Sequence, residues 1–153
     1  MTHLNVGDQA PDFSGENEKG ETISLSDYAG KKLILFFYPK DNTPGCTAEA
    51  CNLRDNYSEL QEKGFELLGV SPDSPKKHTN FIKKFEFPFS LLADTELETI
   101  KAYGIWGLKK FMGKEYEGVH RTTFLIDEEG KVLEIFKKVK TKTHAEQIMD
   151  VVA

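Results

Sequence analysis

The chain has 153 residues, of which 39% are hydrophobic and 29% are charged, and its formal net charge is -5. This length and composition predict one ordinary domain, residues 1–153, long enough to bury a core, and the modest negative charge argues against nucleic-acid binding. The chain opens with no apolar leader and contains no apolar run of membrane-spanning length, so we expect a cytoplasmic protein with no membrane partner.

Strands and helices are expected to alternate along the chain. The apolar run KKLILFFYP (31–39) predicts a buried strand, and good helix-forming sequence after it predicts a helix that stops at Gly64. The later elements are a strand over 65–71, a helix over 74–85, a strand over 89–94, a helix over 98–105, strands over 121–127 and 131–139, and a helix over 143–152. The glycine-containing segment around Trp106 is interpreted as a loop over one end of the sheet.

This order predicts the fold class. Crossover helices between the first strands imply parallel neighbours, and the hairpin signal Glu128-Glu129-Gly130 adds antiparallel ones. We therefore expect an α/β protein with a mixed central β-sheet and helices on both faces. The order of elements is similar to that of a thioredoxin-like domain with extra segments.

The stretch Thr43-Pro44-Gly45-Cys46 is the most informative part of the chain. Thr43 suits a helix N-cap and Pro44 the first helical position, which makes Cys46 the third helical residue. Unpaired N–H groups and the positive end of the helix dipole favour a thiolate there, and the thiolate is the nucleophilic form of cysteine. Cys51 lies more than a turn deeper, where the dipole field has faded. The spacing therefore indicates Cys46 as the attacking thiol and Cys51 as a second thiol.

Other readings of the two cysteines have to be weighed. Both can be small buried apolar residues, as free cysteines often are. A zinc site is disfavoured because the C-x4-C pair has no second ligand pair nearby, and no metal is expected. The four histidines lie scattered, at His3, His78, His120 and His144. An ordinary thioredoxin-type dithiol is disfavoured because C-x-x-C is absent, and in a reducing compartment a cysteine pair is more often catalytic than structural.

The spacing of the pair constrains any disulfide between Cys46 and Cys51. Five helical steps place the Cα atoms roughly 8.6 Å apart, on sides of the helix that differ by about 140°. A disulfide tolerates a Cα separation of at most about 7 Å. We therefore expect that a bond between the two sulfurs requires part of the helix to unwind, as helix ends do for less free energy than global unfolding.

At this point the residues carry a family resemblance. The segment FFYPKDNTPGCTAEACNLRD resembles the active-site segment of peroxiredoxins, whose pattern Pro-x-x-x-Thr-x-x-Cys is met by Pro39, Thr43 and Cys46. The second cysteine, Cys51, resembles that of the bacterioferritin comigratory protein branch, also called the Q-type peroxiredoxins. The resemblance covers nearly the whole chain, from VGDQAPDF to the segment that ends RTTFLID.

The resemblance implies an activity without a cofactor. A hydroperoxide, either hydrogen peroxide or an organic one, would be reduced to water or an alcohol, with electrons from thioredoxin or a similar dithiol protein. Cys46 would be the peroxidatic cysteine, which becomes a sulfenic acid, and Cys51 the resolving cysteine, which condenses with it to an intramolecular disulfide. Because resolution is internal, one reason to dimerise is removed and a monomer is expected.

Four further residues are candidates for the site. Thr43 and the backbone N–H of Cys46 can donate hydrogen bonds to the peroxide oxygens. Arg121 matches the family arginine beside the reactive sulfur, where its role would be electrostatic; the alternative is a surface cation at a strand end. Pro39 can shield the sulfur or merely end a strand. Glu49 can order the arginine side chain or face solvent.

Three other functions remain open from the residues alone, one of which is a non-catalytic binding module, for which alkylation of both thiols would change nothing. The chain could be a protein dithiol-disulfide oxidoreductase, or a peroxide sensor that passes its disulfide to a partner. The arrangement around Cys46 fits peroxide better, and Cys51 supplies an internal resolving thiol that makes a partner unnecessary. Peroxide loss coupled to a thioredoxin system, compared with disulfide transfer to a test protein, separates these functions.

Overall fold

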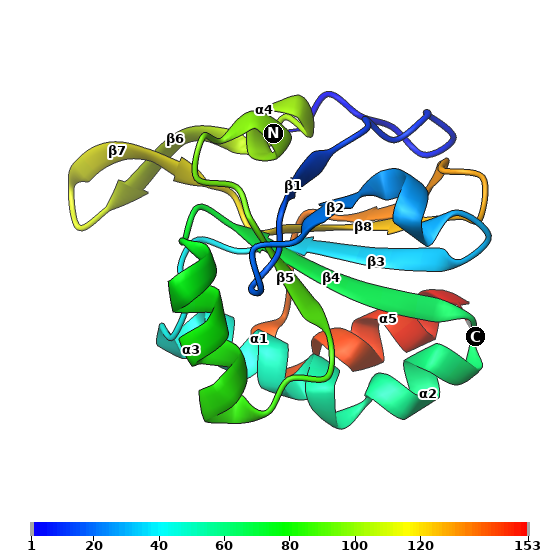
Figure 1. Ribbon diagram of the computed structural model, residues 1–153. Helices are drawn as coiled ribbons and strands as arrows, with labels where there is room; N and C mark the ends of the chain where they lie inside the picture. The colour runs from blue at the N-terminus through cyan, green and yellow to red at the C-terminus, as the bar shows by residue number, and fades with distance from the viewer. Residues whose placement is uncertain (1, 153) are drawn as a thin grey trace.

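A mixed seven-stranded β-sheet forms the centre of the protein in the computed structural model, which describes residues 2–152 (Figure 1). The strand order is β2-β1-β5-β4-β3-β8-β9. The three middle strands are parallel and are β3 (Lys32–Phe37), β4 (Phe65–Ser71) and β5 (Ser90–Ala93). Antiparallel strands flank them: β8 (Thr122–Ile126) and β9 (Val132–Phe136) on one side, β1 (Ser14–Glu16) and β2 (Thr22–Ser24) on the other. The predicted mixed sheet is confirmed.

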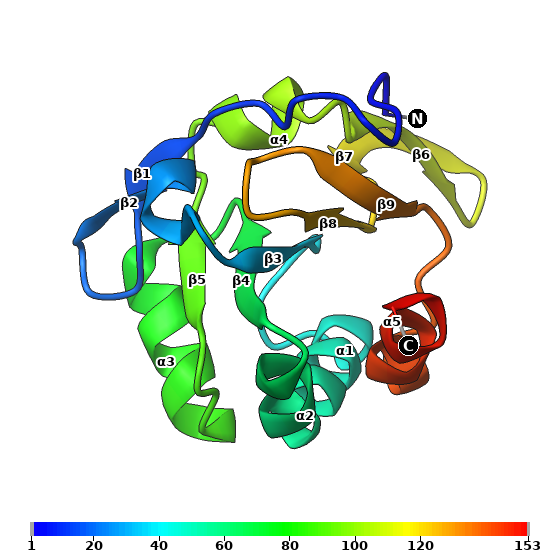
Figure 2. The same ribbon diagram turned by 90° about the vertical axis from the view of Figure 1, so that its right-hand side faces the viewer.

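Helices lie on both faces of the sheet, but unequally. One face is covered by four helices, α1 (Pro44–Asp55), α2 (Tyr57–Glu62), α3 (Pro75–Phe85) and α5 (His144–Val152), which lie below the sheet in Figures 1 and 2. The short helix α4 (Glu98–Ala102) and the N-terminal segment cross the other face. Two 3-10 turns, Leu25–Tyr28 and Thr141–Thr143, complete the secondary structure. No helix within residues 2–152 is long and apolar enough to cross a membrane.

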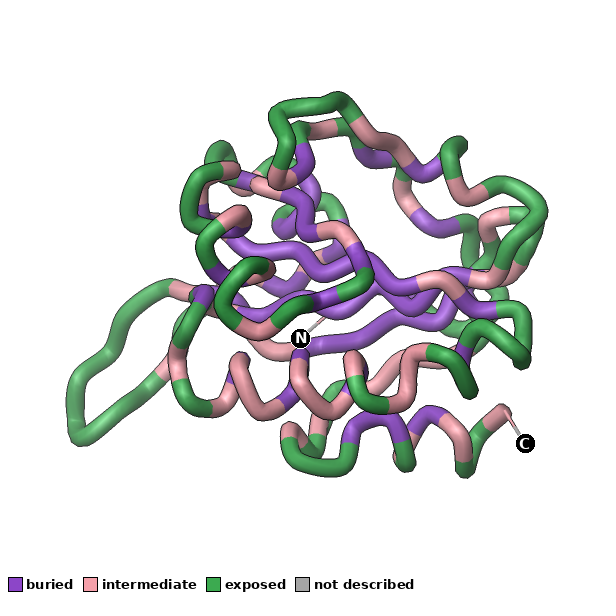
Figure 3. Tube along the Cα trace, turned by 60° about the horizontal axis from the view of Figure 1, so that its bottom comes forward, coloured by how far each residue is buried: buried purple, intermediate pink, exposed green. Residues whose placement is uncertain are grey.

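In the central strand β3 every residue after Lys32 is buried, and the middle of the molecule is correspondingly purple in Figure 3. Leu33, Leu35 and Phe37 belong to the core between the sheet and α4. The alternate residues Ile34 and Phe36 belong to the core between the sheet and the four helices on its other face. Side chains of a strand point alternately to the two faces, so a strand with two covered faces needs an unbroken apolar run. This requirement explains the KKLILFFYP signal.

The single helix predicted up to Gly64 is divided into two helices, α1 and α2, so the prediction of one continuous helix was wrong. The chain breaks at Asn56, whose backbone angles are φ -109° and ψ 13°. The side-chain amide of Asn56 donates to the carbonyl of Asn52 at 2.9 Å, and its backbone N–H contacts the same oxygen. An asparagine that competes for backbone groups in this way favours the end of a helix over its interior.

The predicted loop around Trp106 is a β-hairpin, and that interpretation was wrong. Strands β6 (Trp106–Phe111) and β7 (Lys114–Val119) pair antiparallel in a separate two-stranded sheet that projects from the body of the protein (Figure 1). The connection is Met112-Gly113, and both residues have positive φ, 51° and 78°. Two positive φ values are typical of a two-residue type I′ turn. Most of the hairpin's residues are exposed, so its sequence lacks the apolar alternation that marks a strand.

The hairpin of β1 and β2 was not predicted. Both strands have only three residues, too few to show a clear alternation of apolar and polar side chains. Their turn is fixed by Asn17, whose side-chain oxygen accepts hydrogen bonds from the N–H groups of Lys19 and Glu21 at 2.9 and 3.0 Å. Asparagine side chains commonly stabilise turns in this way.

Candidate active site

Cys46 and Arg121 are brought together by the pairing of two central strands. Cys46 is the third residue of α1, which follows β3 after a short loop, and Arg121 directly precedes β8. Strands β3 and β8 are antiparallel, with Phe37 opposite Thr122. The end of β3 and the beginning of β8 therefore lie side by side, which places residues 75 positions apart at one site.

Arg121 contacts both the thiol and a carboxylate. Its Nη2 lies 3.3 Å from Cys46 Sγ, and its Nη1 lies 2.6 Å from Glu49 Oε1. Burial lowers the pKa of Arg121, but attraction to Glu49 and to Cys46 outweighs this effect, so its pKa is raised on balance. The Arg121 side chain is 22% exposed and Cys46 only 3%, so this cation faces the sulfur in a largely water-free setting. A fixed guanidinium in such a setting stabilises negative charge on sulfur.

Glu49 is fully buried, so the solvent-facing alternative for this residue was wrong. It lies three residues after Cys46, and residues at this spacing share a helix face, so both side chains point toward Arg121. Burial raises the pKa of Glu49 to about 7, although the charge and hydrogen bond of Arg121 oppose the shift. Its second oxygen, Oε2, has no hydrogen-bond partner among residues 2–152. Glu49 therefore holds Arg121 with one oxygen only.

A histidine from the C-terminal helix completes the buried network, and sequence reasoning missed it. His144 Nε2 lies 3.8 Å from Glu49 Oε2 and 2.8 Å from Thr123 Oγ1. Its Nδ1 lies 2.9 Å from the side-chain oxygen of Gln147, which can only accept. Burial lowers the pKa of His144 to about 4, and the charge of Arg121 acts in the same direction. The imidazole is therefore neutral at pH 7, with Nδ1–H donating to Gln147 and Nε2 accepting from Thr123.

Gly45 makes room for the arginine. A Cβ atom at this position would lie 3.3 Å from Arg121 Nη2, tighter than most contacts of a real Cβ. Arg121 cannot easily give way, since Glu49 and Cys46 hold its other contacts. The glycine in the Thr43-Pro44-Gly45-Cys46 stretch is thus explained by the close passage of the side chain of Arg121, which directly precedes β8.

Thr43 occupies the N-cap position with extended backbone angles, but its side chain does not cap the helix. Its hydroxyl instead donates to the carbonyl of Lys40 at 2.8 Å, within the loop that connects β3 to α1. Pro39 begins this loop and is partly buried. Both residues lie on the segment that leads into Cys46, as their spacing predicts.

The two cysteines are free thiols in an unbroken α1. Cys46 is buried, whereas Cys51 is partly exposed, and burial raises the pKa of the Cys51 thiol. This is the geometry in which the Cα atoms are too far apart for a disulfide, roughly 8.6 Å for five helical steps. Among residues 2–152, no cluster of His, Cys, Asp and Glu side chains is arranged to hold a metal ion.

The mixed central sheet and the buried thiol at the start of α1 fit a peroxiredoxin, and known relatives place the chain in this class of thiol-dependent peroxidases. The chain belongs to the AhpC/TSA family, whose model matches residues 6–135. Among curated relatives, the putative peroxiredoxin bcp of Haemophilus influenzae is 49% identical over 150 residues, 98% of this chain and 97% of the relative. Peroxiredoxin Bcp of Bacillus subtilis is 47% identical over 146 residues, 95% of this chain and 93% of the relative.

Solved structures agree with these relatives. Peroxiredoxin Q of Xanthomonas campestris superimposes with a TM-score of 0.87 at 34% identity, covering 99% of this chain and 96% of that one. A cysteine-to-serine mutant of PrxQ from Xylella fastidiosa gives a TM-score of 0.92 at 31% identity, covering 99% and 97%. The resemblance to the bacterioferritin comigratory, Q-type branch is confirmed, as is the thioredoxin-like fold.

Proposed function

We propose that Cys46 is the peroxidatic cysteine of this peroxidase. Its thiolate attacks one oxygen of a hydroperoxide, so that an S–O bond forms as the O–O bond breaks. The leaving oxygen takes up a proton and departs as water or an alcohol, and Cys46 becomes a sulfenic acid. In this step negative charge moves from sulfur to the leaving oxygen, and fixed donors aimed at both atoms lower the barrier.

The observation that carries this proposal is the 3.3 Å contact between Arg121 Nη2 and Cys46 Sγ. Arg121 would stabilise the attacking thiolate and donate hydrogen bonds to the peroxide oxygens. The guanidinium keeps its charge at neutral pH, so it acts as an electrostatic group and never as the proton donor. Glu49 orients it through the 2.6 Å bond to Nη1. Pro39 and Thr43 would shape the approach to the sulfur from the preceding loop.

Cys51 is proposed as the resolving cysteine. Its thiol attacks the sulfenic sulfur of Cys46, a disulfide forms and water leaves. Because both residues are helical here, α1 must lose at least the turns between them before the two sulfurs can bond. Helix ends open locally for less free energy than global unfolding requires. The same helix therefore activates Cys46 when folded and permits resolution when unwound.

The substrate and the reductant follow from the same chemistry. The bacterioferritin comigratory protein of Xanthomonas campestris is described by its alkyl peroxide reduction activity. By similarity to it, we propose alkyl hydroperoxides as substrates here, together with hydrogen peroxide. A dithiol protein such as thioredoxin would reduce the disulfide in the cytoplasm. Internal resolution requires no second subunit, so a monomer is proposed.

Two cysteine variants test the proposal. Cys46→Ser should abolish peroxide reduction, because it removes the thiol that attacks the peroxide. Cys51→Ser should react once with peroxide and then turn over poorly with thioredoxin. Peroxide consumption coupled to a thioredoxin system measures both. Full turnover by Cys51→Ser would refute the resolving role, while disulfide transfer to a test protein without peroxide consumption would indicate a dithiol oxidoreductase instead.

A further inference from the structure

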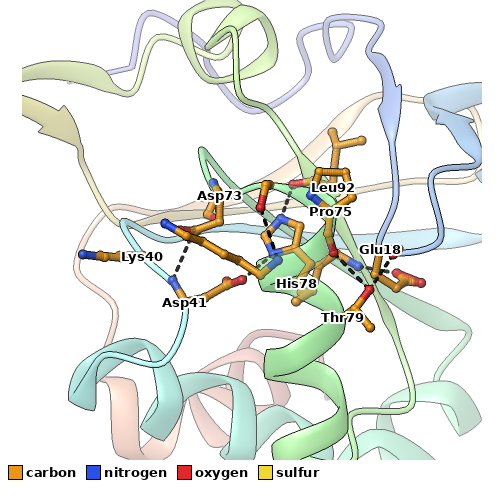
Figure 4. Close-up of polar contacts among 12 residues, drawn as sticks. Glu18, Lys40, Asp41, Asp73, Pro75, His78, Thr79 and Leu92 are labelled. Atoms are coloured by element: carbon orange, nitrogen blue, oxygen red, sulfur yellow. Dashed lines mark hydrogen bonds and ion pairs between the residues drawn. The ribbon is translucent and has the colours of Figure 1, made fainter.

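A second buried polar cluster lies beside the loop that leads to Cys46. It joins three elements: Asp41 from the β3–α1 loop, Asp73 from the segment after β4, and His78 from α3 (Figure 4). His78 is fully buried, and the two aspartates are 8% exposed. Burial of ionisable groups is costly unless they are paired and hydrogen-bonded. The reaction proposed above uses none of these residues.

The hydrogen bonds of the cluster fix where its protons lie. His78 Nε2 lies 3.0 Å from the carbonyl oxygen of Leu92, which can only accept, so Nε2 carries a hydrogen. His78 Nδ1 lies 2.6 Å from Asp41 Oδ2, a distance that requires one more proton between the two atoms. Tyr38 supplies a further hydrogen bond, from its hydroxyl to Asp41 Oδ1 at 2.6 Å. Both carboxyl oxygens of Asp41 are therefore held, and His78 with Asp41 forms a pair that shares one proton.

The cluster also holds the backbone of the loop. The N–H of Asp41 donates to Asp73 Oδ2 at 2.7 Å, and the hydroxyl of Ser71 donates to the same oxygen at 2.7 Å. Lys77 approaches the other oxygen of Asp73, at 4.0 Å. A loop with few apolar contacts would otherwise move freely, since Lys40 and Asn42 on either side of Asp41 are exposed. Asp41 is thus the buried anchor of this loop.

The anchor stands directly before the proposed reaction centre. The backbone carbonyl of Lys40 accepts a hydrogen bond from the Thr43 hydroxyl, and Asn42 adopts a left-handed backbone conformation, with φ of 59°. Asparagine tolerates that conformation, but it is held only where surrounding contacts impose it. A shift of Asp41 therefore moves Thr43 and, through the first turn of α1, Cys46.

We propose that His78 is a positioning residue for peroxide reduction, acting through its proton-sharing pair with Asp41 on the loop that carries Thr43. This inference rests on the proposed reaction of Cys46 with peroxide. His78 touches neither sulfur nor substrate in this role. Its effect is to keep the first turn of α1 and its preceding loop in the geometry that the attack requires, where displacements of about 1 Å can cost up to 100-fold in rate.

Two substitutions at His78 separate this role from general support of the fold. In His78→Asn, the side-chain amide occupies the position of Nδ1 and keeps a donor toward Asp41. In His78→Gln, the amide reaches the position of Nε2 and keeps only the bond to Leu92. We expect His78→Gln to slow the reaction of Cys46 with peroxide at least about tenfold, and His78→Asn to restore most of the rate.

Thr79→Val is the matched control. Thr79 lies next to His78 on α3, and its hydroxyl oxygen lies 2.6 and 3.0 Å from the carbonyl oxygens of Glu18 and Pro75, away from the loop (Figure 4). The variant should lose stability and leave the peroxide reaction unchanged. Cys46 oxidation is followed in a single turnover by mass spectrometry. Alkylation of Cys46 by iodoacetamide, which needs a thiolate but no aligned peroxide, is measured in parallel and should change little in His78→Gln.

The outcomes are distinct. If the wild-type Cys46 does not react with peroxide, the proposed function itself fails. If the wild type reacts and His78→Gln reacts equally fast, the positioning role fails. Faster alkylation of Cys46 in both His78 variants, with no rescue by His78→Asn, would mean that the site is merely loosened and would also overturn the role. Should neither variant fold, Tyr38→Phe removes one bond to Asp41 instead, and an unchanged peroxide rate in that variant would overturn the proposal.

Discussion

The side-chain oxygen of Asn52 accepts a hydrogen bond of 2.7 Å from the backbone N–H of Ala145, which fastens the cysteine helix α1 to the first turn of α5. The side-chain nitrogen of Asn52 also contacts the carboxylate of Glu146, at 3.2 Å. Asn52 directly follows Cys51. Unwinding α1 far enough to join Cys51 to Cys46 must therefore disturb this attachment.

We predict that Asn52→Ala speeds disulfide formation. A net hydrogen-bond contribution of about 1 kcal/mol, lost from the folded helix, corresponds to roughly fivefold faster unwinding. Sulfenic acid on Cys46 then has less time to be oxidised further to sulfinic acid. Rapid-quench mass spectrometry of the Cys46 and Cys51 peptides measures both products. Equal disulfide rates in Asn52→Ala and the wild type would contradict the prediction.

Replacing Gly45 should separate stability from reactivity. Gly45→Ala favours the helix by up to about 1 kcal/mol, because alanine is the better helix former. The added Cβ meets Arg121 Nη2 at 3.3 Å and displaces the guanidinium from Cys46. Because Arg121 is also bonded to the buried Glu49, we expect the gain in unfolding free energy, measured in denaturant titrations, to fall short of this amount. The single-turnover reaction with peroxide should be slower by several-fold. A peroxide rate equal to that of the wild type would show that Arg121 adjusts without cost.

Glu49 should make stability fall as pH rises. Its pKa is about 7 in the folded protein against an ordinary value of 4.5, so the folded state holds a proton that the unfolded state has released. The contribution of Glu49 is greatest below pH 4.5 and is lost as pH rises to 7, by an amount on the order of 3 kcal/mol. The difference in unfolding free energy between the wild type and Glu49→Gln should therefore decline over this range. A difference in unfolding free energy that does not change with pH would contradict this assignment of the Glu49 pKa.

The stability contributed by His144 should rise with pH, opposite to the contribution of Glu49. Its pKa is about 4 in the folded protein against an ordinary value of 6.5, so the unfolded state binds the proton first. The stability that His144 contributes is present above pH 6.5 and is lost as pH falls to 4, again on the order of 3 kcal/mol. Urea titrations of the wild type and His144→Gln should show their difference shrinking toward acid. Slopes of the same sign for the Glu49 and His144 variants would refute one of the two assignments, the one whose sign differs from its prediction.

The sequence alone was sufficient for the strands and helices that have strong local signals. The central strand, the helix after Ser74 and the start of the Cys46 helix were all predicted, because burial on two faces and a proline after a capping residue leave clear patterns. The projecting hairpin of β6 and β7 left no such pattern, since exposed strands need no apolar alternation. The break at Asn56 depends on a single side-chain contact that helix propensity does not capture.

The candidate site divides in the same way. Spacing alone selected Cys46 over Cys51, because the field of a helix terminus acts only over its first turn. Whether Glu49 faced solvent or Arg121, and whether Arg121 reached the sulfur at all, depended on the pairing of β3 with β8. Likewise, the places of His78 and His144 became visible only once α3 and α5 were packed against the sheet. The reactivity of a residue that depends on its neighbours in the chain can be predicted from the sequence. Contacts with side chains from distant segments are decided by tertiary packing.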